Sequence, residues 1–195
     1  MSKIIVMVHG ISDTGDVFQS LASHLQKQGY QTYAPDLTPS YGLEDLTKLA
    51  IKLKHYIDTT IPRGSINLLG FSMGGLVTRY YLQRLNGIER VKKYITISAP
   101  NNGTITAYFL PFAGVVQMRP NSNFLNDLNQ DRHYQLGSLE ILNLWTPFDM
   151  TIIPAKSSLM GLGLEKSIPV WTHRWMLEDK RVFAQITQFL AAPNT

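Results

Sequence analysis

The chain has 195 residues, of which 44% are hydrophobic and 16% are charged, and its formal net charge is +4. This length predicts a single domain over residues 1–195 with one substantial core. Lys and Arg are scattered without a cluster, which argues against nucleic-acid binding and leaves at most transient contact with an anionic membrane surface. The absence of cysteine excludes disulfides, thiol nucleophiles and thiolate metal sites.

The N-terminal apolar run at residues 4–8 is shorter than the apolar core of an export signal, and we interpret it as a first strand. No apolar run approaches the roughly 20 residues that a membrane helix needs. The sequence therefore leads us to expect a soluble protein of the cytoplasm.

Strands and helices are predicted to alternate through the first half of the chain. Asp13 or Thr14 is the expected cap of the first helix, and Gly29 is its expected end. Strands are predicted at residues 4–8, 31–35 and 66–69, and helices between the first two strands, over 43–58 and over 73–85.

The second half keeps this alternation less regularly. Strands are predicted at residues 91–98, 140–145 and 167–171, with a short helix over 121–128 and a closing helix over 179–192. Residues 105–118 are apolar but poorly periodic, because Pro111 and Gly114 interrupt them. The pattern predicts an α/β fold with about six mostly parallel strands flanked by helices on both faces.

The sequence Gly70-Phe71-Ser72-Met73-Gly74 follows a buried strand and opens a helical pattern. A serine between two glycines on such a turn is typical of a nucleophile elbow, in which the cramped backbone leaves no room for neighbouring side chains. The alternative is a turn of small residues without chemistry. The residues at the ends of the other strands must decide between the two.

Ligands of such sheets bind beyond the carboxyl ends of the strands, so the polar residues that follow each strand are the candidates for a site. Ser72, Asp149 and His173 occupy such positions, in that order along the chain. A serine hydroxyl needs an imidazole to accept its proton, and the imidazole needs a carboxylate that orients it. The three residues supply this set.

Other residues compete for two of these roles. Asp36, which follows the second strand, and Glu165 are alternative acids, although an aspartate that opens a loop often only binds the backbone. His9 is an alternative base, but we interpret it as a brace of the loop after the first strand. Asn101 to Thr104 forms either a simple turn or part of the site wall.

Together, His9-Gly10-Ile11, the elbow, the loop from Asn101 to Thr104, Asp149 and His173 resemble the α/β-hydrolase superfamily, and within it the small lidless class 2 bacterial lipases and esterases. The resemblance implies a minimal α/β-hydrolase fold. It also implies that the main-chain N–H groups of Ile11 and Met73 stabilise the oxyanion. Neither a metal nor an organic cofactor is implied.

The resulting hypothesis is a serine carboxylester hydrolase, a lipase or esterase that acts on a small-molecule or lipid ester. Candidate substrate-binding residues are His9, Gly10, Tyr108, Phe109 and Phe112. Residues 105–118 either cover the sheet or form an acyl-binding wall. Two alternatives stay open: an acyltransferase or thioesterase with the same triad, and a non-catalytic binding protein of this fold. The sequence does not predict the oligomeric state.

Overall fold

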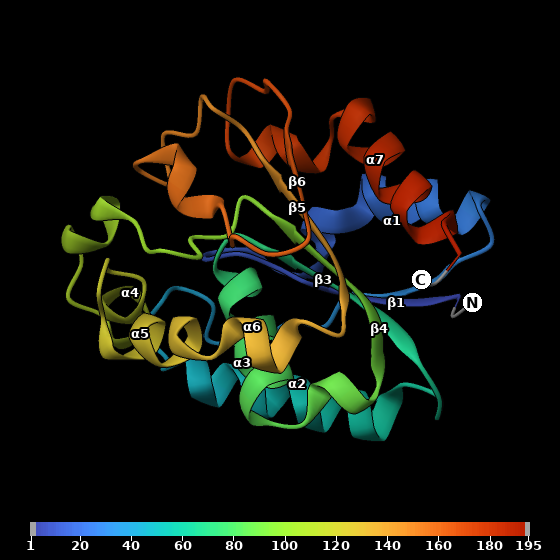
Figure 1. The fold of residues 1–195 in the computed structure, drawn as a ribbon, viewed down its shortest axis with the longest axis horizontal. Helices are drawn as coiled ribbons and strands as arrows, with labels where there is room; N and C mark the ends of the chain where they lie inside the picture. Colours follow the sequence, from blue (N-terminus) through green and yellow to red (C-terminus); the bar gives the residue numbers. More distant parts are fainter. Residues whose placement is uncertain (1–2, 194–195) are drawn as a thin grey trace.

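Six parallel strands form one sheet in the computed structural model, which describes residues 3–193 (Figure 1). The strands are β1 (Ile4–Val8), β2 (Gln31–Tyr33), β3 (Ile66–Phe71), β4 (Val91–Ile97), β5 (Glu140–Trp145) and β6 (Leu164–Ser167). Their order across the sheet is β2-β1-β3-β4-β5-β6, so the chain winds from β1 to one edge and then back across to the other. This confirms the predicted fold class.

Helices cover both faces of the sheet because its inner strands are apolar on both sides. In β1, Ile5 and Met7 pack toward one face and Val6 and Val8 toward the other. The first face is covered by α1 (Gln19–Lys27) and α7 (Lys180–Ala191). The second is covered by α2 (Leu46–Thr60), α3 (Met73–Arg84), α4 (Ala113–Gln117), α5 (Asn123–Gln130) and α6 (Arg132–Leu136). Over residues 3–193, no helix is both long and apolar enough to cross a membrane.

Side-chain caps explain where several helices begin. The helix expected from residue 43 begins at Leu46, because the Asp45 carboxylate accepts a hydrogen bond from the Thr47 N–H at 2.8 Å. Near the start of the chain, a short 3₁₀ helix (Gly15–Phe18) precedes α1, and Thr14 makes no side-chain cap there. Asp36 supplies the acceptor instead, at 2.7 Å from the Gly15 nitrogen.

The predicted last strand at residues 167–171 is misplaced, since β6 spans Leu164–Ser167. Ile168 and Val170 are buried as the sequence suggested, but they pack against the core after the strand has ended. The Val170 N–H donates to the Ile168 carbonyl at 2.8 Å, which turns the chain around Pro169. The Ile168 N–H still donates to the Trp145 carbonyl at 2.9 Å, but Val170 is hydrogen-bonded to this part of the chain through the Thr146 hydroxyl. Burial therefore extends beyond the strand, which explains the error.

Residues 105–118 form two short helices, a 3₁₀ turn (Ile105–Tyr108) and α4. Ala107, Val115 and Met118 are buried in the core cluster that also contains residues of α2 and α3, so part of the segment covers the core. Helix α6 was not predicted, and the short helix expected at 121–128 is shifted to Asn123–Gln130, where the Ser122 hydroxyl caps it.

Candidate active site

Ser72 lies at the sharp turn between β3 and α3, with φ 52° and ψ −125°. This conformation is strained for a residue with a side chain. The neighbouring glycines allow it: a methyl group on Gly74 would lie 2.2 Å from the Val8 carbonyl oxygen, and one on Gly70 would lie 2.6 Å from Cα of Gly75. Helix α3 therefore lies closer to β1 and β3 than a residue with a Cβ atom at position 70 or 74 would permit. This geometry matches the steric reason for which the motif was singled out.

His173 and Asp149 form a hydrogen-bonded pair beyond the ends of β6 and β5. The Nδ1 atom of His173 lies 2.8 Å from Oδ2 of Asp149. Oδ1 of Asp149 accepts the N–H groups of Thr151 at 2.9 Å and Ile152 at 2.8 Å. Burial raises the pKa of Asp149, but the hydrogen bond and charge of His173 and the two amides outweigh it and hold this pKa below its ordinary value. Asp149 is therefore an ionised acceptor that orients the imidazole.

The second ring nitrogen of His173 is buried, and Nε2 has no hydrogen-bond partner among the described residues. His173 also packs against the ring of Phe71, with centroids 4.8 Å apart. No hydrogen bond joins Ser72 to His173 within residues 3–193, but both line one cavity of about 300 Å³. Its lining consists of Ile11, Ser12, Asp13, Phe71, Ser72, Thr151, His173 and Arg174. An unpaired imidazole nitrogen and a serine thus share one small cavity.

The two main-chain N–H groups expected to bind an oxyanion have no competing main-chain acceptor among the described residues. Met73 is the first residue of α3, so its N–H has no partner within the helix. Ile11 lies in the loop after β1, and no main-chain acceptor for its N–H is found in the part of the chain that the structure describes. Both donors come from segments that adjoin Ser72.

His9 is buried, and both of its ring nitrogens bind the backbone. Nε2 accepts the Leu37 N–H at 2.9 Å, so Nδ1 carries the proton and donates to the Gly10 carbonyl at 2.9 Å. This is the bracing role that we assigned to His9, and its side chain is not part of the cavity lining. Gly10 is adjacent to the site, since a methyl group there would lie 3.0 Å from Cβ of Ser72.

The three aromatic residues proposed to bind substrate are not brought into the cavity lining. Tyr108 lines a different pocket, where the Arg119 guanidinium lies 4.9 Å from its ring centroid. Phe109 is 84% exposed, and Phe112 packs against the core. These three residues could therefore contact only the part of a substrate that extends outside the cavity.

The alternative acids are engaged elsewhere. Asp36 accepts the N–H of Gly15, and Glu165 accepts the N–H of Gly161 at 2.7 Å. Neither carboxylate is hydrogen-bonded to a histidine in the described range 3–193. The loop-opening role predicted for Asp36 matches its contact in the structure.

Thr104 braces the loop that carries Asp149. Its hydroxyl accepts the Ile153 N–H at 2.9 Å and donates to the Thr151 carbonyl at 3.0 Å. The loop from Asn101 to Thr104 thus supports the acid rather than lining the cavity.

Several lining residues were not predicted as site residues: Ser12, Asp13, Phe71, Thr151 and Arg174. Each lies within two residues of a predicted one, so sequence proximity to the strand ends was the available signal.

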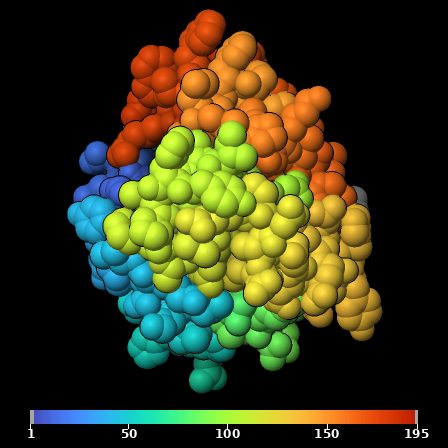
Figure 2. Space-filling model, turned by 90° about the vertical axis from the view of Figure 1, so that its left-hand side faces the viewer, coloured from blue at the N-terminus to red at the C-terminus, as the bar shows by residue number. Residues whose placement is uncertain are grey.

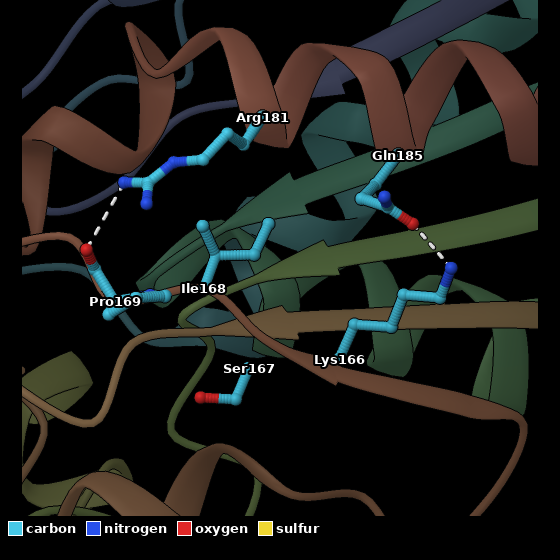
Figure 3. Close-up of a pocket in the computed structure, with 6 residues that line it drawn as sticks. All are labelled: Lys166, Ser167, Ile168, Pro169, Arg181 and Gln185. Atoms are coloured by element: carbon cyan, nitrogen blue, oxygen red, sulfur yellow. Dashed lines mark hydrogen bonds between the residues drawn. The ribbon is translucent and has the colours of Figure 1, made fainter.

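Cavity volume alone does not identify the site. A pocket of about 460 Å³ lies between β6 and α7, and Figure 3 shows Lys166, Pro169, Arg181 and Gln185 around it. The polar side chains that line this pocket bind each other or the backbone: Lys166 is hydrogen-bonded to Gln185, and Arg181 donates to the Pro169 carbonyl at 3.1 Å. It contains Ser167 but no histidine. The smaller cavity holds the reactive groups.

Comparison with known proteins places this geometry in context. Residues 3–190 match the protein family described as "alpha/beta hydrolase fold". The match covers both loops that carry His173 and Asp149 as well as the elbow.

Solved structures with a similar fold include enzymes of bacteria and fungi. The mature lipase BlEst2 of Bacillus licheniformis superposes with a TM-score of 0.78 at 17% identity, covering 96% of this chain and 91% of that one. Aspergillus fumigatus lipase B superposes with a TM-score of 0.77 at 16% identity, covering 100% of this chain and 54% of that one. A pyrethroid hydrolase of Sphingobium faniae gives 0.67 at 17% identity, with 99% of each chain covered. At these identities the similarity concerns the fold.

Proposed function

The chain belongs to the alpha/beta hydrolase family, and from this premise we propose that it is a serine carboxylester hydrolase of the lipase or esterase type. The observation that carries the proposal is the His173–Asp149 pair: Nε2 of His173 has no hydrogen-bond partner in the described chain, and His173 shares a cavity with a serine on a strained elbow. Imidazole oriented by a carboxylate beside a serine is the arrangement that activates a hydroxyl as a nucleophile.

In the proposed reaction, Oγ of Ser72 attacks the ester carbonyl carbon while its proton moves to Nε2 of His173. The carbonyl oxygen becomes an oxyanion held by the N–H groups of Ile11 and Met73. The intermediate collapses, the bond to the leaving alcohol breaks, and His173 transfers its proton to that alcohol. A water molecule then gives a proton to His173 and attacks the carbonyl carbon of the acyl-enzyme. The bond from that carbon to Oγ of Ser72 breaks, and His173 returns the proton to Oγ, which releases the acid and restores Ser72. Asp149 stays ionised throughout, consistent with its lowered pKa.

We propose a hydrophobic or lipid ester as the substrate class. Figure 2 shows the face at which the strands end, where the lime-green segment around residues 105–117 adjoins the orange loop after β5. Large apolar side chains are exposed in the segments that follow β4, β5 and β6: Tyr108, Phe109, Phe148, Met150, Trp171 and Trp175. Exposed apolar groups near a site favour an apolar partner, and transient contact with a membrane surface is part of this proposal.

The proposal predicts release of p-nitrophenol from p-nitrophenyl esters by the purified protein. Acyl chains from C2 to C16 should be compared, because the cavity of about 300 Å³ holds only part of a long chain and the rest would lie on the exposed apolar surface. Absorbance of p-nitrophenol gives kcat and KM for each chain length. Rates no higher than the spontaneous rate for every ester would refute the proposed function.

A further inference from the structure

An ion pair between two charged side chains forms part of the lining of the candidate active site. Nη1 of Arg174 lies 2.6 Å from Oδ1 of Asp13, and both side chains line the same cavity as Ser72. Arg174 directly follows His173, and Asp13 lies two residues after Ile11. The pair thus joins the loop that carries the base to the loop that carries a proposed oxyanion donor.

The two charges of this pair differ in their surroundings. The Asp13 side chain is 7% exposed, whereas that of Arg174 is 64% exposed. A methyl group on Gly10 would lie 3.2 Å from Oδ2 of Asp13 and 3.0 Å from Cβ of Ser72, so the carboxylate and the elbow flank the same small space. A buried negative charge therefore lies beside the serine.

Such a charge opposes the proposed chemistry. Attack by Ser72 places a second negative charge on the ester oxygen, and two negative charges that share one small cavity repel each other more strongly than in bulk water. Arg174 is the cation that compensates Asp13, since no other ion pair of Asp13 is found among residues 3–193. Without the positive charge of Arg174, the free energy of the transition state would rise relative to that of the ground state.

We propose that Arg174 is a positioning residue that acts through Asp13: its guanidinium cancels the Asp13 charge beside the developing oxyanion. The inference rests on the proposed function, because it concerns the same cavity. Arg174 does not contact the ester in this proposal. Asp13 is itself retained as the anchor that holds the loop after β1 against the loop that carries His173.

The test compares Arg174→Gln, Asp13→Asn, the double variant and Arg174→Lys at pH 8. We expect Arg174→Gln to lower kcat for ester hydrolysis about 10- to 100-fold with little change in KM. The double variant should recover to within about threefold of Asp13→Asn, because the repelling charge is then gone. Arg174→Lys should retain most of the activity, since its positive charge is kept.

Arg181→Gln is the matched control. The Arg181 side chain, which Figure 3 labels, is 57% exposed, and its Nη2 atom lies 2.7 Å from Oδ2 of Asp179 in an ion pair outside the site. This variant should hydrolyse esters like the wild type. Thermal unfolding of each variant shows that the protein is folded.

Two groups of outcomes are distinguishable. A wild-type protein that hydrolyses no ester refutes the proposed function, and the inference falls with it. An active wild type overturns the inference alone if Arg174→Gln matches Arg181→Gln, if it changes only KM, or if Asp13→Asn fails to restore kcat in the double variant.

Discussion

Replacing Ser72 with alanine is expected to lower kcat for ester hydrolysis by about 10⁴-fold or more while the protein stays folded. The variant lacks the only atom that forms the acyl-enzyme in the proposed reaction. The strained backbone at φ 52° is the same for alanine, and Ser72 makes no side-chain hydrogen bond within residues 3–193 that its removal would break. Assays with p-nitrophenyl esters measure the loss of kcat, and a thermal unfolding curve shows whether the variant is folded.

Ser98→Ala is the matched control for this change. Ser98 is also a buried serine with positive φ, 46°, and it follows the neighbouring strand β4. Its hydroxyl has no hydrogen-bond partner in the described part of the chain, yet it does not line the cavity. The kcat of Ser98→Ala for ester hydrolysis should remain within about twofold of that of the wild type. Equal losses in the two variants would mean that the effect is structural and not chemical.

Asp149→Asn should lower kcat by about 10⁴-fold through the tautomer of His173. Oδ1 of Asp149 accepts two main-chain N–H groups, at 2.9 and 2.8 Å, so the amide oxygen of asparagine must take that place. Its NH₂ group then points at Nδ1 of His173, which must become an acceptor. The proton moves to Nε2, and this nitrogen can no longer accept the Ser72 proton. NMR of the imidazole nitrogens reports the tautomer directly.

Asp36→Asn tests the other aspartate that follows a strand. An asparagine oxygen can still accept the Gly15 N–H that lies 2.7 Å from Oδ1 of Asp36. Activity should therefore stay near that of the wild type. A large loss in Asp36→Asn together with full activity in Asp149→Asn would reverse the assignment of the acid.

The lowered pKa of Asp149 adds a dependence of stability on pH. Because the pKa of Asp149 in the folded state is below its ordinary value of 3.8, the ionised carboxylate stabilises the fold above that value, and this contribution is lost as pH falls through the folded-state pKa. The free energy of unfolding of the wild type should thus fall more steeply below pH 4 than that of Asp149→Asn.

Local sequence was sufficient for the elements whose cause is local. The elbow was predictable because the glycines on either side of Ser72 are themselves the steric requirement, and the contacts of Gly70 and Gly74 bear this out. Inner strands were predictable because residues such as Ile5 and Val6 are buried on both faces of the sheet. The placement of the serine, the aspartate and the histidine after predicted strands then followed from the alternation of strands and helices.

Features that depend on tertiary contacts were not predictable in this way. Ile168 and Val170 have the apolar pattern of a strand, yet they are buried in a turn beside the sheet edge. Phe109 is as apolar as a wall residue but points to solvent. The Asp13–Arg174 pair joins positions 161 residues apart, and no sequence pattern links them.

Labelling with a fluorophosphonate probe tests the central claim most directly, because the probe forms a covalent bond only with an activated serine. Mass spectrometry of the intact protein and of its peptides should find one adduct, on Ser72, in the wild type. The adduct should be lost in His173→Ala, since Nε2 is then no longer available as the base. A folded wild-type protein that stays unlabelled, or a label at Ser72 that forms equally fast in His173→Ala, would contradict the account.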